Sequence, residues 1–82
     1  MRKRNYYRYE LKNENKVLYK GITNNPERRE EEHKKEGKRF SNMKIIGPVV
    51  TKPSAEEWEE KSLEIYRKNH GGKNPRYNKL EK

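Results

Sequence analysis

The sequence predicts an α+β fold, a small three-stranded antiparallel sheet with flanking helices in β-β-α-β-α order. Residues 5–11 alternate around the chain axis, and residues 17–22 supply a return strand after a polar turn, which is typical of a β-hairpin. Cap signals at Asn25 and Ser54 each precede a helical segment, and the β-branched run 44–50 lies between these segments. A chain of 82 residues has the length of one domain, covering residues 1–82.

The first predicted strand has two distinct faces. Its side chains divide into Tyr7, Tyr9 and Leu11 on one side and Tyr6, Arg8 and Glu10 on the other. Residues 13–16 (Asn-Glu-Asn-Lys) form the predicted turn, and residues 17–22 return beside the first strand. Tyr9 and Tyr19 are therefore expected on neighbouring strands.

The first helix is predicted to begin at Asn25-Pro26, which combines an N-cap residue with a proline in the first turn, and to stop at Gly37. This segment has no aliphatic or aromatic side chain, so we expect it to rest on the stems of Arg and Lys and on His33. The alternative is a solvated helix stabilised by ion pairs four residues apart.

The second half of the chain predicts a strand, a helix and a tail. Pro48 restricts the strand at residues 44–50 to an edge or a bulge. Ser54 is the predicted N-cap of the second helix, with Glu57 completing a capping box. Gly71-Gly72 ends that helix, and residues 73–78 form a tail that can fold back over the domain.

The second helix is predicted to be amphipathic. Its inward stripe follows three- and four-residue steps through Ala55, Trp58, Ser62, Tyr66 and Asn69, with Leu63 and Ile65 beside it. Glu59 lies four residues after Ala55 and four before Leu63, so its carboxylate is predicted to face inward. Glu60 and Glu64 are predicted to face solvent.

The charge of the chain points to a polyanionic partner. A net charge of +9 attracts nucleic acid, and DNA is the partner that we expect. No apolar stretch has the length of a membrane span and no signal-peptide pattern follows the basic start, so we expect a cytoplasmic protein, free or nucleoid-associated, without membrane binding. The absence of cysteine leaves carboxylate, imidazole and phenol groups for any reaction.

Six residues have a spacing that favours a catalytic site over an ordinary surface. Arg29 lies ten positions after Tyr19, and His33 lies one helical turn after Arg29, so both helical side chains can point to one spot. The set is completed by Tyr9, Glu59 and Asn78. Three further cations are predicted to bind nucleic acid: Lys20, Arg28 and Arg76.

These residue types suit phosphodiester hydrolysis, which needs a positioned water, a proton acceptor and positive charge for the phosphoryl oxygens. Glu59 offers an oxygen ligand for Mg²⁺ or Mn²⁺; its alternative role is that of a glutamate favoured by the helix dipole. Arg29 offers a planar cation for phosphate, and His33 offers a proton relay near neutral pH. The tyrosines orient water and phosphate, or simply fill the core.

The motifs from Tyr7 to Asn78 together resemble the GIY-YIG nuclease family, most of all its small stand-alone members, and residues 75–78 are similar to the end of the nuclease domain found in the excinuclease. The resemblance implies an endonuclease with one divalent metal ion. It implies the following roles: Tyr9 as the base that activates water, Tyr19 as the second-motif tyrosine, Arg29 as the phosphate-binding arginine, His33 as the assisting histidine, Glu59 as the metal ligand and Asn78 as the tail asparagine near the site.

The chain departs from the family pattern at several positions. Tyr7 and Arg8 stand where the family has Gly and Ile, Lys20 replaces an Ile, and Glu30 occupies a place that is usually apolar. Gly21 is kept, as expected if the backbone turns closely toward phosphate or a helix.

The sequence therefore predicts a Mg²⁺- or Mn²⁺-dependent DNA endonuclease, and two alternatives stay open. One is a basic nucleic-acid-binding module that does not cut. The other is an interaction protein whose charges only keep it in solution. A chain of this length has no room for a separate targeting domain, so selectivity would have to come from DNA structure, a second copy of the chain or a protein partner.

Overall fold

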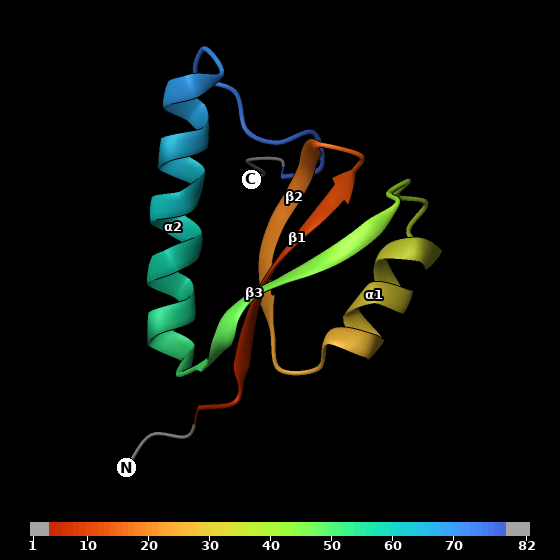
Figure 1. The fold of residues 1–82 in the computed structure, drawn as a ribbon, viewed down its shortest axis with the longest axis vertical. Coiled ribbons are helices and arrows are strands. Elements are labelled where there is room, and N and C mark those ends of the chain that lie inside the picture. Colours follow the sequence, from red (N-terminus) through yellow and green to blue (C-terminus); the bar gives the residue numbers. More distant parts are fainter. Residues whose placement is uncertain (1–3, 79–82) are drawn as a thin grey trace.

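The computed structural model describes residues 4–78 and has the predicted element order (Figure 1). Its elements are β1 (Tyr6–Asn13), β2 (Lys16–Thr23), α1 (Pro26–Lys35), β3 (Asn42–Val50) and α2 (Lys52–Asn69). The three strands form one antiparallel sheet, which confirms the predicted α+β fold.

The central strand of the sheet is β1, because the strand order is β2-β1-β3. Tyr9 of β1 lies opposite Gly21 of β2 and opposite Ile45 of β3. Since β3 is an edge strand, Pro48 occupies the kind of position that the sequence predicted for it.

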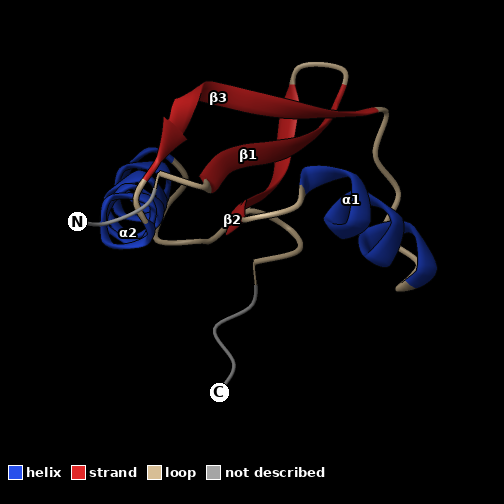
Figure 2. Ribbon diagram, turned by 90° about the horizontal axis from the view of Figure 1, so that it is seen from below, coloured by secondary structure: helices blue, strands red, loops and turns tan. Residues whose placement is uncertain are grey.

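The two helices flank the sheet on either side (Figure 2). The alternation of β2 shows the same arrangement, because consecutive strand residues point to opposite faces. The ring of Tyr19 contacts His33 of α1, whereas the ammonium of Lys20 lies 5.8 Å from the ring centre of Trp58 in α2. The β2 strand therefore contributes side chains to both layers.

Both helix starts depend on side-chain caps. In α1 the Asn25 side chain accepts a hydrogen bond from the Arg28 N–H, as predicted, and Gly37 follows the helix with φ of 88°. In α2 the cap is Thr51, whose hydroxyl accepts from the Ser54 N–H at 3.4 Å. The predicted capping box that began at Ser54 was wrong, because Pro53 occupies the first turn without needing an N–H partner, and the helix starts earlier.

The core is small, as expected from the low apolar content. The buried hydrophobic side chains are Tyr9, Leu11, Leu18 and Ala55, and His33 is fully buried among the polar residues. Burial of His33 confirms that α1 rests on it. Neither helix within residues 4–78 is both long and apolar enough to cross a membrane.

The inward stripe of α2 is confirmed in its first three turns only. Ala55 is fully buried, and Trp58 and Tyr66 are half-buried. Asn69 is exposed because it lies in the last turn of the helix, and Ile65 is 60% exposed. Ile65 precedes Tyr66 by one residue, a rotation of about 100°, which turns it away from the sheet.

The tail after α2 folds back along the outer edge of β2, as predicted. The N–H of Tyr77 donates to the carbonyl of Leu18 at 2.7 Å. The side chain of Asn78 bonds to both backbone groups of Lys20, accepting from N–H at 2.6 Å and donating to C=O at 2.9 Å. The tail thus satisfies backbone groups that would otherwise be open on this edge strand.

Candidate active site

A buried hydrogen bond joins the central strand to α1. The Tyr9 hydroxyl lies 2.8 Å from Nε2 of His33, and both side chains are fully buried. Gly21, opposite Tyr9 in the sheet, makes room for this ring, since a Cβ atom at Gly21 would lie 2.7 Å from the Tyr9 hydroxyl oxygen. The groups that approach Gly21 closely are thus the rings of Tyr9 and Tyr19, where the sequence had predicted phosphate or a helix.

Tyr19 completes an aromatic cluster with this pair. Its ring lies 5.9 Å from the ring of Tyr9 in a stacked arrangement and 4.7 Å from the imidazole of His33 in a tilted one, measured between ring centres. Tyr19 is only half-buried, whereas its two partners are fully buried. The cluster therefore reaches the surface at Tyr19.

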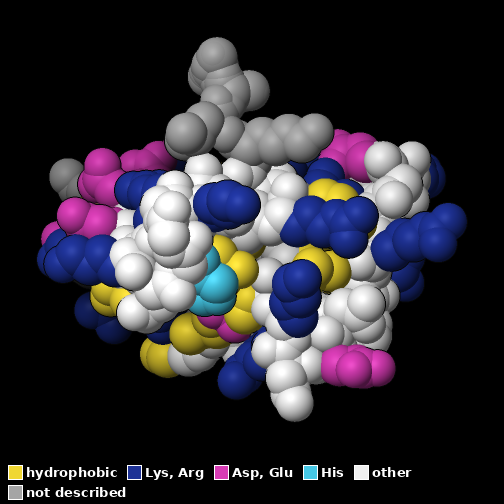
Figure 3. Space-filling model, turned by 90° about the horizontal axis from the view of Figure 1, so that it is seen from above, with side chains coloured by type: hydrophobic (Ala, Val, Ile, Leu, Met, Phe, Trp, Pro, Cys, Tyr) yellow, Lys and Arg dark blue, Asp and Glu magenta, His cyan; other side chains and the backbone are white. Residues whose placement is uncertain are grey.

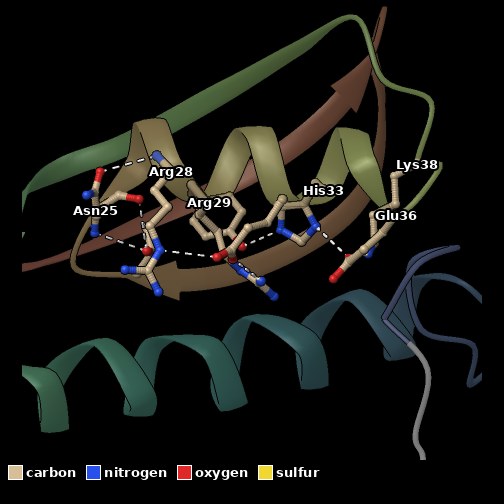
Figure 4. A network of polar contacts seen from close by, with 9 residues as sticks. Asn25, Arg28, Arg29, His33, Glu36 and Lys38 are labelled. Carbon is tan, nitrogen blue, oxygen red and sulfur yellow. Dashed lines mark hydrogen bonds and ion pairs between the residues drawn. The ribbon is translucent and has the colours of Figure 1, made fainter.

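Arg29 lies beside the aromatic cluster. Figure 4 shows that Arg29 and His33 project from the same side of α1. The guanidinium donates to Glu32 at 2.8 Å and interacts with the phenol oxygens of Tyr9 and Tyr19. Arg28, by contrast, is exposed and pairs only with Glu32. The arginine at the predicted ten-residue distance from Tyr19 is therefore the one next to the tyrosines.

The environment opposes charge on both members of the buried pair. Burial, reinforced by Tyr19, raises the pKa of the Tyr9 phenol far above its ordinary value, although Arg29 counteracts the shift. Burial and the positive charges of Arg29 and Lys38 lower the pKa of His33 to about 4. At neutral pH the phenol is thus protonated and the imidazole neutral, so the Tyr9 hydroxyl donates and Nε2 accepts.

The second nitrogen of His33 is left without a hydrogen bond. Because Nε2 accepts from Tyr9, the proton of the neutral ring belongs on Nδ1. This buried atom has no hydrogen-bond partner, and the nearest carboxylate oxygen, on Glu36, is 3.7 Å away. Glu36 and Lys38 lie at the C-terminal end of α1 in Figure 4, paired with each other. His33 is therefore held mainly by Tyr9 and by packing.

Glu59 lines a cavity of about 400 Å³ beside the aromatic cluster. Its lining also includes Tyr19, Leu63, Arg67, Asn74, Tyr77 and Asn78. Burial and the nearby negative charge of Glu56 raise the pKa of the Glu59 carboxyl. The inward orientation predicted for Glu59 is confirmed, and its carboxylate is destabilised in a way that a bound cation would relieve.

The donor set around Glu59 restricts the kind of metal ion that fits. Within residues 4–78 no group of three or more His, Cys, Asp or Glu side chains is placed to hold a metal. A site built from protein ligands alone, as for structural zinc, is therefore not formed by these residues. One carboxylate in an open cavity does fit Mg²⁺ or Mn²⁺, which keep several waters and take further ligands from substrate phosphates.

Asn78, the tail residue of the predicted set, lines the cavity but is occupied in holding the tail. Its amide uses one acceptor and one donor site on the backbone of Lys20. One acceptor lone pair and one N–H remain on the amide. The structure thus brings Asn78 to the site chiefly as a residue that positions the tail.

Lys20 does not belong to the surface predicted to bind nucleic acid. It is 8% exposed and forms an ion pair with Glu10 on the α2 side of the sheet. The reason is strand alternation, because Tyr19 faces the site and its neighbour must face the other layer. The other two predicted nucleic-acid contacts, Arg28 and Arg76, are exposed.

Three residues of the cavity were missed by the sequence reasoning: Arg67, Asn74 and Tyr77. For Arg67 a signal was present, since it follows Glu59 by two successive four-residue steps on the same helix face. Its guanidinium donates to the Asn74 side chain at 2.9 Å, which ties the tail to α2. Lys38 was missed as well; its ammonium lies 5.7 Å from the ring centre of Tyr19 and 6.0 Å from that of Tyr77.

The candidate site therefore has two parts that share Tyr19. One is the buried pair of Tyr9 and His33 with Arg29 beside it, and the other is the cavity of Glu59 and Asn78. Comparison of the chain with known proteins found no matching family model, no matching curated protein and no matching solved structure.

Proposed function

We propose that this protein is a metal-dependent endonuclease that hydrolyses DNA phosphodiester bonds, as the resemblance to the GIY-YIG family implies. The observation that supports the proposal most is the sharing of Tyr19 between two groups of predicted residues. On one side Tyr19 contacts Tyr9, Arg29 and His33, and on the other it lines the cavity of Glu59. Residues from a hairpin, two helices and a tail are thus close enough to act on one phosphate.

Arg29 supplies the permanent positive charge in this mechanism. Burial by itself would lower its pKa, but the interactions with Glu32, Tyr9 and Tyr19 outweigh burial and raise it. A guanidinium that stays charged can bind two phosphoryl oxygens and stabilise the negative charge that develops on them. Its side chain is 32% exposed, so a phosphate can reach it from solvent.

A proton relay through Tyr9 follows from the hydrogen bond to His33. A phenol with a raised pKa does not ionise by itself, so it can accept a proton from the attacking water only by passing its own proton to Nε2 of His33. The water then becomes the oxygen nucleophile that bonds to phosphorus, and the leaving oxygen departs. The negative charge of the bound phosphate offsets Arg29 and Lys38, which lower the pKa of His33, and so makes imidazolium formation easier.

Glu59 would hold the divalent ion. Bound there, Mg²⁺ or Mn²⁺ would supply positive charge for the phosphate oxygens and the leaving oxygen. Tyr19 borders the same cavity, and its half-exposed phenol is placed to orient the phosphate between Arg29 and Glu59. Arg67 and Asn74, joined by a hydrogen bond, shape the wall between α2 and the tail.

The direct test is incubation of the purified protein with supercoiled plasmid in Mg²⁺, in Mn²⁺ and in excess chelator. The proposal expects nicked circles with either ion and intact plasmid with chelator. Intact plasmid under all three conditions would contradict it. Because DNA is the proposed substrate, the cytoplasm and its nucleoid are the proposed location.

One observation favours the alternative of a non-catalytic nucleic-acid-binding module. Tyr9 and His33 are fully buried, so the relay reaches solvent only through neighbouring atoms. A plain binder would retard DNA in gels equally with chelator and with Mg²⁺, and would leave plasmid intact. The same incubation therefore separates the two functions.

A further inference from the structure

A second surface of the protein has the chemistry of a nucleic-acid contact. A cavity of about 690 Å³ lies between the β1–β2 turn and the end of α2, lined by residues 13–17 together with Tyr66 and His70. A neighbouring cavity of about 340 Å³ is lined by Lys16, Tyr66, His70, Lys73, Asn74 and Arg76. Because Lys16, Tyr66 and His70 border both, the two cavities form one continuous depression.

An ordered aromatic pair lines this depression. The rings of Tyr66 and His70 stack face to face, with centres 3.7 Å apart and planes inclined by 5°. Nδ1 of His70 lies 2.8 Å from the carbonyl oxygen of Tyr66, which fixes the orientation of the imidazole. Tyr66 covers one face of the imidazole, and His70 is exposed, so its other face is open for stacking. Such a preordered ring suits a nucleobase, since every base has a flat face.

The depression also carries excess positive charge. Lys16, Lys73 and Arg76 are all exposed, and in the part of the chain that the structure describes none of them forms an ion pair. The lining acid is Glu14. Figure 3 looks onto this end of the molecule and shows a histidine surface with Lys and Arg around it. This histidine is His70, because His33 is fully buried.

The depression adjoins the candidate active site through the tail. Asn74 lines both the smaller cavity and the cavity of Glu59, and Arg76 follows it by two residues. A strand that leaves the Glu59 cavity along the tail would therefore meet Arg76 and Lys73 and then the His70 ring. An acidic peptide would satisfy the cations but would leave the stacked ring without a partner.

We infer that the Tyr66–His70 pair with Lys16, Lys73 and Arg76 forms a second contact for single-stranded DNA, in which an unpaired base stacks on His70 and the cations bind flanking phosphates. The inference rests on the proposed function only in taking this strand as part of the same substrate. The binding itself requires no cleavage and no metal ion.

The experiment measures binding in excess chelator by fluorescence anisotropy, with a short labelled oligothymidylate and an oligonucleotide of equal length that has abasic sites. We expect the unsubstituted protein to bind the abasic strand about fivefold more weakly or worse, because base stacking is lost while the phosphates remain. His70→Ala should abolish this difference, and His70→Phe should restore it, since phenylalanine keeps a flat ring.

Charge substitutions test the other half of the inference. Replacing both Lys73 and Arg76 by Gln should weaken binding of the two strands alike and reduce the slope of affinity against salt. Lys68→Gln is the matched control, because Lys68 is an exposed lysine of α2 outside the lining of either cavity; it should leave the preference for the base-bearing strand intact.

Several results would overturn the inference. Equal binding of the two strands by the unsubstituted protein would exclude stacking, and a preference that survives His70→Ala would place the stacking elsewhere. Competition by polyglutamate against the oligothymidylate that is stronger than competition by the abasic strand would favour an acidic peptide. A protein with the strand preference but without plasmid nicking would keep this site and lose the nuclease, whereas nicking without the preference would do the reverse.

Discussion

The hydroxyl of Tyr9 and Nε2 of His33 lie 2.8 Å apart in the interior, and this hydrogen bond connects the centre of the sheet to α1. It is the main polar anchor of a helix that has no aliphatic or aromatic side chain of its own. The same bond supplies the proposed route for a proton out of the site. Stability and chemistry thus depend on one pair of atoms.

Tyr9→Phe should remove both contributions at once. The free energy of unfolding should fall by about 1–3 kcal/mol, because Nε2 of His33 is left buried without a partner. Metal-dependent nicking should be lost, as measured on supercoiled plasmid beside urea unfolding curves. Tyr7→Phe is the control on the same strand, where the side chain is only half-buried, and it should change both quantities little. A Tyr9→Phe variant with unchanged nicking would remove Tyr9 from the proton route.

The stability of the protein should depend on pH through His33. Burial first, and then Arg29 and Lys38, lower the pKa of this imidazole from 6.5 to about 4 in the folded state. Between these values the unfolded chain binds a proton that the folded protein does not bind. The contribution is thus fully present above about pH 6.5 and is lost as the pH falls toward 4, by on the order of 3 kcal/mol in total.

Urea unfolding of the protein and of His33→Gln over this pH range is the measurement. Glutamine cannot gain the proton, so the variant should show a flatter dependence of the unfolding free energy on pH. Parallel curves for the two proteins would mean that His33 titrates with an ordinary pKa. The carboxyl groups, whose unfolded pKa values lie lower, are common to both proteins and cancel in the comparison.

Arg29→Ala should lower the rate of plasmid nicking by on the order of 10²-fold or more, because a charged donor to the developing phosphoryl charge is lost. Arg28→Ala is the matched control. Arg28 has the same charge and shares the Glu32 carboxylate, but it is exposed and is not beside the tyrosines. Equal losses in both variants would mean that the position of Arg29 next to Tyr9 and Tyr19 is unimportant for activity.

Glu59→Gln should abolish Mg²⁺-dependent cleavage while DNA binding persists or strengthens. The substitution keeps the size of the side chain but removes the charge that a divalent ion needs, and it also relieves repulsion of phosphate. Gel retardation and nicking assays on the same preparation measure the two effects. Glu60→Gln, which changes an exposed carboxylate on the next residue, should behave as the unsubstituted protein does. The opposite pattern would reassign the metal ligand to Glu60.

Lys20→Gln tests the burial of a residue that the sequence assigned to DNA binding. Because Lys20 and Glu10 are both largely buried, loss of one charge leaves the other unpaired, and the free energy of unfolding should fall by about 3 kcal/mol. The salt dependence of DNA binding should not change at temperatures where the variant is folded. Lys16→Gln, at an exposed lysine of the same strand, should show the reverse behaviour. A reduced salt slope in folded Lys20→Gln would return Lys20 to the DNA-binding surface.

Local sequence signals were sufficient for the element order and for one of the two helix starts. Asn25 before Pro26 and Gly37 after the helix mark α1 because each acts within a single turn of backbone. At α2 two hydroxyl residues compete for the cap, and the actual cap, Thr51, depends on where the chain leaves β3. The sequence could not decide this, since both residues have the side chain that a cap requires.

The sequence by itself determined the spacing that unites Tyr19, Arg29 and His33, because a strand, a short connection and one helical turn convert sequence distance directly into direction. The tertiary structure alone decided which groups actually meet. It set the Tyr9 ring across Gly21 against His33, turned Lys20 toward Glu10, and brought Asn78 back to β2. These contacts join residues from 10 to 58 positions apart, and their geometry follows from sheet register and packing, which no local pattern encodes.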